Sequence, residues 1–138
     1  MANPPSPPFG KGGRGGICWE GGISRAGDRV KVIGLMSGTS ADGVDAALVE
    51  ILPEDHHPRI RLVAWTCMAY PPGLRERILR AASGGSTEDV CHLNAYLGEL
   101  FAQTAGQVAR QAGVELGDVA LIGSHGQTIH HLPVPRRE

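Results

Sequence analysis

The amino-acid sequence predicts an α/β domain, and three observations support that prediction. Three segments rich in β-branched residues follow one another, at Val30–Met36, Val44–Ile51 and Arg59–Cys67. The apolar residues then change to the three- and four-residue spacing of a helix, most clearly from Ser86 onwards. After that helix, Val119–Ile122 has the composition of a buried strand.

The first three strands are separated by short turns, which favours an antiparallel meander. Ser37–Gly43 forms the first turn and Pro53–Pro58 the second. The first strand, Val30–Met36, is expected to be buried. The third strand, Arg59–Cys67, alternates polar and apolar residues, which predicts one solvated face.

A short helix is expected after the meander. Pro72 suits the first helical position, and Leu74, Ile78 and Leu79 form an apolar face that ends at Gly84-Gly85. The segment is therefore predicted to pack one side against the sheet.

A longer helix is predicted from Ser86, with Asp89 as its capping-box partner. Gly113 is the residue expected just after its end. The predicted apolar stripe comprises Val90, Leu93, Leu97, Phe101, Ala105, Val108 and Ala112. A fourth predicted strand, Val119–Ile122, leads into a tight turn at Gly123–Thr128, and Ile129–Leu132 is expected to begin another strand.

Composition divides the chain in two and excludes some classes of function. Residues 1–28 are rich in proline and glycine and are expected to be a disordered extension, whereas residues 29–138 form the ordered domain. A net charge of −1 argues against nucleic acid or an anionic membrane as partner. The three cysteines are widely spaced, and Cys67 and Cys91 are expected in the core as free thiols. The sequence shows no signal peptide and no membrane span, so a cytoplasmic protein is expected.

The first turn has the residue types of a phosphate site. Glycines at 34, 38 and 43 are expected to take positive φ or to let the backbone approach a ligand, and Ser37, Thr39 and Ser40 offer hydroxyl groups. Asp42 and Asp45 fit beside phosphates if a divalent cation, held through water, lies between them. Composition alone favours an ordinary hairpin turn, and the segment is not a Walker A loop.

Two long sequence segments resemble a known family, and this resemblance favours the phosphate site over an ordinary hairpin turn. Residues 32–49, with the core Gly34-Leu35-Met36-Ser37-Gly38-Thr39-Ser40-Ala41-Asp42-Gly43-Val44-Asp45, closely resemble the start of anhydro-N-acetylmuramic acid kinases. Residues 121–131, with Gly123-Ser124-His125-Gly126-Gln127-Thr128, resemble a second signature of that family. The order and separation of the two strings also match.

The resemblance implies an actin-like sugar kinase/Hsp70 superfamily fold (ribonuclease H-like), of which residues 29–138 would be a partial N-terminal lobe. It implies an enzyme that uses ATP and water to open 1,6-anhydro-N-acetylmuramic acid and phosphorylate the sugar, in peptidoglycan recycling and amino-sugar metabolism. ATP and Mg²⁺ are the implied cofactors, and the resemblance allows a homodimer of the full-length protein. The implied ATP-binding residues are Gly38, Thr39, Ser40, Ala41, Asp42, Gly43, Val44 and Asp45, with Asp42 facing the metal through water.

Ser124, His125 and Gln127 are the candidate contacts to the amino-sugar substrate. The general-base aspartate has no counterpart here and is expected beyond Glu138, so the chain is expected to be an incomplete N-terminal part, inactive alone. Two alternatives remain open: a non-catalytic nucleotide- or sugar-binding module, and another sugar kinase of the same superfamily.

Overall fold

The computed structural model describes residues 29–52 and 57–129. The extension predicted for residues 1–28 lies outside this range. Of the strand predicted at Ile129–Leu132, only Ile129 is described, and it is not in a strand.

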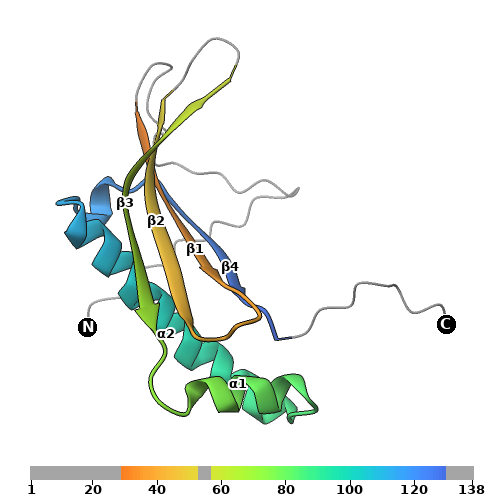
Figure 1. The fold of residues 1–138 in the computed structure, drawn as a ribbon. Coiled ribbons are helices and arrows are strands. Elements are labelled where there is room, and N and C mark those ends of the chain that lie inside the picture. The colour runs from red at the N-terminus through yellow and green to blue at the C-terminus, as the bar shows by residue number, and fades with distance from the viewer. Residues whose placement is uncertain (1–28, 53–56, 130–138) are drawn as a thin grey trace, which may run out of the picture.

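A four-stranded mixed sheet forms one layer of the molecule (Figure 1). β1 (Val30–Ser37), β2 (Gly43–Leu52) and β3 (Arg59–Ala69) are antiparallel neighbours, which confirms the predicted meander. β4 (Leu121–Gln127) lies beside β1 and runs parallel to it, giving the order β3-β2-β1-β4. A parallel neighbour needs a long crossover, and the two helices supply it.

β4 is longer than predicted, and the tight turn expected at Gly123–Thr128 is wrong. The pairing of β1 with β4 continues from Leu35–Ser124 to Ser37–Gln127, with one extra residue on β4 between these pairs. Gly126 has a φ of 74°, a conformation that glycine adopts without strain. The glycine therefore absorbs an irregularity within the strand and does not end it.

The short helix α1 (Leu74–Ala82) begins two residues later than predicted. Gly73 stands at its N-cap with a φ of 83°, so Pro72 lies outside the helix. Leu74 and Ile78 are buried as expected, whereas Leu79 is exposed.

The long helix α2 (Thr87–Gln111) has the predicted ends. Ser86 and Asp89 form the complete capping box. At the other end Gly113 has a φ of 64°, and its N–H and that of Val114 bond to the carbonyls of Arg110 and Ala109. This is a Schellman motif, which satisfies the last carbonyls of the helix. A 3₁₀ turn, η1 (Leu116–Asp118), then leads to β4.

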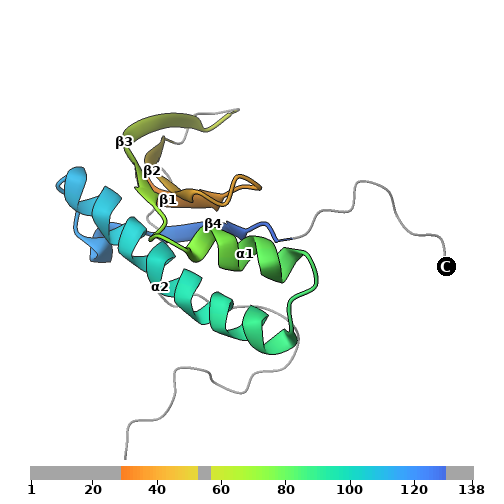
Figure 2. The ribbon, with the colours of Figure 1, turned by 60° about the horizontal axis from the view of Figure 1, so that its bottom comes forward.

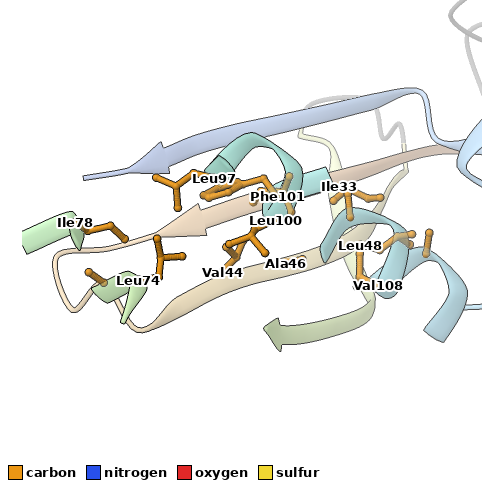
Figure 3. Close-up of a cluster of buried hydrophobic side chains, with 14 of the residues drawn as sticks. Ile33, Val44, Ala46, Leu48, Leu74, Ile78, Leu97, Leu100, Phe101 and Val108 are labelled. Carbon is orange, nitrogen blue, oxygen red and sulfur yellow. The ribbon is translucent and has the colours of Figure 1, made fainter. Parts of the chain in front are cut away.

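Both helices lie on the same side of the sheet (Figure 2). Alternate residues of β1 and β2 point toward α2 and form the core with it, as Figure 3 shows for Ile33, Val44, Leu48, Phe101 and Val108. Strand alternation thus places one face of each strand in contact with the helices.

Within the described residues, the other face of the sheet is open. On this face Met36 is 52% exposed and the edge-strand residue Leu121 is 50% exposed. Ile122 pairs with Ile33 and so points to the helix side, but at this edge it is still 47% exposed. The expectation that β1 and β4 are buried strands is therefore wrong for one face of β1 and for the start of β4, because no described helix covers them. Cys67 and Cys91, expected in the core, are also exposed.

Candidate functional site

The β1–β2 turn divides the predicted ATP-binding residues into two groups. Thr39, Ser40 and Asp42 are exposed and Gly38 is half-buried. Ala41, Gly43 and Val44 are buried, and Ala41 and Val44 belong to the hydrophobic core. The exposed group is free to meet a ligand, and the buried group fixes the turn to the domain.

The conformation of the turn depends on an alanine and not on the glycines predicted for that role. Ala41 has a φ of 49°, whereas Gly34, Gly38 and Gly43 are not among the residues with positive φ. Gly43 matters for a different reason: a Cβ there would lie 2.5 Å from the backbone oxygen of Met68. Close approach of β3 to β2 explains that glycine.

Hydrogen bonds hold the turn while leaving several of its donors available. The Ala41 N–H bonds to the Gly38 carbonyl at 3.3 Å, and the Ser40 hydroxyl donates to the Asp42 carboxylate at 2.8 Å. Within the described residues, the N–H groups of Thr39, Ser40 and Asp42 donate to no backbone carbonyl. Exposed N–H groups gathered in one turn are suited to binding an anion.

Two residues at this site were not predicted from the sequence. The Tyr70 N–H donates to the Asp42 carbonyl at 2.8 Å, and Arg75 donates from Nε to the Ser40 carbonyl at 3.0 Å. The predicted antiparallel meander could have indicated both residues. Because Gly43 pairs with Ala69, the residues that follow β3 must lie beside the β1–β2 turn.

The end of β4 meets the same turn. Gln127 donates from Nε2 to the Gly38 carbonyl at 2.7 Å, which joins the two predicted signatures directly. Ser124 accepts a hydrogen bond from the Gly126 N–H at 3.1 Å, and the exposed His125 has its Nδ1 3.4 Å from the Gly126 carbonyl oxygen.

A cavity of about 400 Å³ opens between this end of β4 and α2. Ser124 and Gln127 line it, but His125 does not. The α2 side of the cavity is mostly apolar, with Val90, Leu93, Leu97 and Phe101, and Asn94 adds one polar side chain. The three predicted sugar contacts are therefore close in the chain but do not share one surface.

Asp45 lies apart from the turn. It is exposed on the open face of the sheet, where it lines a cavity of about 540 Å³ with Met36 and Trp65. The Cys67 thiol lies opposite it on β3, and interaction with the Asp45 carboxylate raises the pKa of that thiol. Asp42 is thus the carboxylate that belongs to the turn.

Fold and site together define an α/β domain in which a hydroxyl-rich hairpin turn, a cationic side chain and the end of a parallel strand meet. Such an arrangement is compatible with the first lobe of a sugar kinase. A family model described as anhydro-N-acetylmuramic acid kinase matches residues 30–138. The chain belongs to the anhydro-N-acetylmuramic acid kinase family.

Several relatives named anhydro-N-acetylmuramic acid kinase resemble the chain closely. The one from Xanthomonas oryzae pv. oryzae (strain MAFF 311018) is 48% identical over 109 residues, 77% of this chain and 29% of the relative. Those from Caldanaerobacter subterraneus subsp. tengcongensis and Gloeobacter violaceus are 42% and 44% identical, over 74% and 77% of this chain and 26% and 28% of the relatives. The chain therefore spans less than a third of the length of these relatives.

Proposed function

We propose that this chain supplies the ATP-phosphate turn of an anhydro-N-acetylmuramic acid kinase. The observation that carries the proposal is the exposed β1–β2 turn, in which the N–H groups of Thr39, Ser40 and Asp42 lack backbone acceptors and the Arg75 side chain lies alongside. Backbone donors and a guanidinium together complement the charge and the lone pairs of a phosphate.

The residues of the turn also fit a magnesium ion bound with the nucleotide. Among the described residues no group of three His, Cys, Asp or Glu side chains is placed to hold a metal. Mg²⁺ in nucleotide sites keeps several waters and takes its other ligands from phosphates, so one exposed carboxylate is sufficient. Asp42 would hold the ion through water, and the ion would neutralise phosphate charge during transfer.

The reaction we propose is hydrolytic opening of 1,6-anhydro-N-acetylmuramic acid with phosphorylation of its 6-oxygen. Ser124 and His125 lie near the end of β4, level with the last residues of β1 before the phosphate turn, and their hydroxyl and imidazole groups can hydrogen-bond an amino sugar. The product, N-acetylmuramic acid 6-phosphate, would belong to peptidoglycan recycling, and we place the activity in the cytoplasm. None of the helices in the described part of the chain is long and apolar enough to cross a membrane.

A chimera tests the proposal. Residues 30–138 of this chain would replace the matching segment of the Xanthomonas oryzae relative, and ADP and phosphosugar would be measured with the anhydro sugar and with a panel of ordinary hexoses. We expect turnover with the anhydro sugar and its loss in the Asp42→Asn chimera. A folded chimera that phosphorylates only a different sugar, or none, would contradict the proposed function.

A further inference from the structure

The side-chain amide of Gln127 makes four close polar contacts within the protein. Its Nε2 donates to the carbonyls of Gly38, at 2.7 Å, and Thr128, at 2.9 Å. Its Oε1 accepts from the Tyr70 hydroxyl at 2.9 Å and lies 2.8 Å from the Ser37 hydroxyl. A primary amide has two donors and two acceptor positions. Both donors and one acceptor position are therefore occupied within the protein, and the second acceptor position faces the Ser37 hydroxyl.

The orientation of this amide is determined by its neighbours. Backbone carbonyls only accept, so the NH₂ group must face Gly38 and Thr128 and the oxygen must face the hydroxyls. Tyr70 can serve as the donor because a phenol is protonated near neutral pH, and burial raises its pKa further. Ser37 has a single hydroxyl hydrogen, which it can give to Gln127 or to the Gly43 carbonyl 2.6 Å away.

These contacts tie together the two ends of the phosphate turn and two other segments. Ser37 and Gly38 begin the turn, and Gly43 ends it. Tyr70 follows β3, and Gln127 ends β4. The Gly38 carbonyl that accepts from Gln127 also accepts from the Ala41 N–H, the bond that closes the turn.

We propose that Gln127 is a positioning residue that holds the Gly38–Asp42 turn in its phosphate-binding conformation. The inference rests on the proposed function for its consequence in ATP binding, but the geometry of the turn can be tested without any nucleotide. Under this proposal Gln127 serves the phosphate side of the site, and other groups bind the sugar. Displacing the end of β4 would then also disturb the turn.

The first test measures backbone amide exchange by NMR in the ligand-free chain. Gln127→Met keeps the length of the side chain and removes its hydrogen bonds, and Gln103→Met, exposed on α2, is the matched control. We expect exchange at Ala41 to rise about tenfold in Gln127→Met, with amides of α2 unchanged in both variants. Unchanged exchange at Ala41, or an equal rise throughout the domain, would overturn the inference.

The second test uses MgATP as the probe in the chimera with the Xanthomonas oryzae relative. Gln127→Met should raise the KM for ATP about tenfold and leave the KM for the sugar within about twofold. The reverse split would show that Gln127 serves the sugar. If the chimera without this substitution binds no ATP, the proposed function fails while the exchange experiment still decides the role of Gln127.

A milder variant guards against loss of folding. Tyr70→Phe removes one donor to Gln127 and keeps the ring in place. Exchange at Ala41 should then rise about threefold, between the original chain and Gln127→Met. No rise in Tyr70→Phe, with a folded domain, would count against the proposed network.

Discussion

Arg75 donates a hydrogen bond of 3.0 Å from Nε to the carbonyl oxygen of Ser40, so a residue in the first turn of α1 contacts the turn between β1 and β2. The side chain is exposed, and its terminal nitrogens remain free to contact an incoming anion in the described part of the molecule. The sequence signatures contain no such cation. The fold brings one to the turn because β3 runs antiparallel to β2 and ends beside it.

Arg75 should therefore contribute to nucleotide affinity. We expect Arg75→Ala to weaken MgATP binding about five- to tenfold, since a charge-assisted hydrogen bond is lost. Isothermal titration calorimetry measures it, and Arg77→Ala, also exposed on α1, is the control. Equal affinities for the two variants would show that Arg75 merely braces the turn.

Gly43 should be intolerant of a side chain. Gly43→Ala would place its Cβ 2.5 Å from the Met68 oxygen, and the required backbone shift should destabilise the domain by about 1–3 kcal/mol. Gly34 has open space around it, so Gly34→Ala should be neutral or stabilise the strand by roughly 0.5 kcal/mol. Urea unfolding followed by circular dichroism compares them, and equal midpoints would contradict the proposed close approach.

The open face of the sheet gives a second contrast in stability. Leu48 is fully buried between β2 and α2, so Leu48→Ala should cost about 2–5 kcal/mol. Leu62 on β3 is 57% exposed, and Leu62→Ala should change the free energy of unfolding by less than about 0.5 kcal/mol. A large loss of stability at Leu62 would mean that this face is covered in solution.

The start of α2 should make stability depend on pH. Hydrogen bonds from the Ser86 hydroxyl and N–H lower the pKa of Asp89 below its usual value of 3.8. A lowered pKa in the folded state stabilises the protein above the unfolded value, and this contribution is lost as pH falls through the folded value.

Asp89→Asn should accordingly destabilise the chain at pH 7, and the difference from the original chain should shrink below about pH 3.8. Glu88→Gln, at an exposed position in the same turn of α2, serves as the control and should show a smaller effect. Thermal unfolding across this pH range measures both. A difference at Asp89 that does not vary with pH would rule out the ionised capping box.

Local patterns predicted most of the fold. The spacing of apolar residues predicted the three strands of the meander and the apolar stripe of α2. The capping box and Gly113 correctly predicted the ends of that helix. What could not be predicted depends on tertiary contacts. A glycine-rich segment such as Gly123–Gln127 suggests a turn locally, and only pairing with β1 makes it a strand.

The candidate site was predicted in part for the same reason. The strings around Gly38 and Gln127 identify the two segments, but sequence alone does not show that Gln127 bonds to Gly38 across 89 positions. It also does not show that Ala41, and none of the glycines, carries the positive φ of the turn. The binding roles of Thr39, Ser40, Asp42, Ser124 and His125 stay predictions.

A titration of the isotopically labelled chain with MgATP, followed by NMR, tests the central claim most directly. We predict saturable shifts of the backbone amides of Gly38, Thr39, Ser40 and Asp42, with little change along the outer face of α2. Shifts that avoid this turn, or that cluster on the open face around Asp45 and Trp65, would contradict the assignment of the β1–β2 turn as the phosphate site.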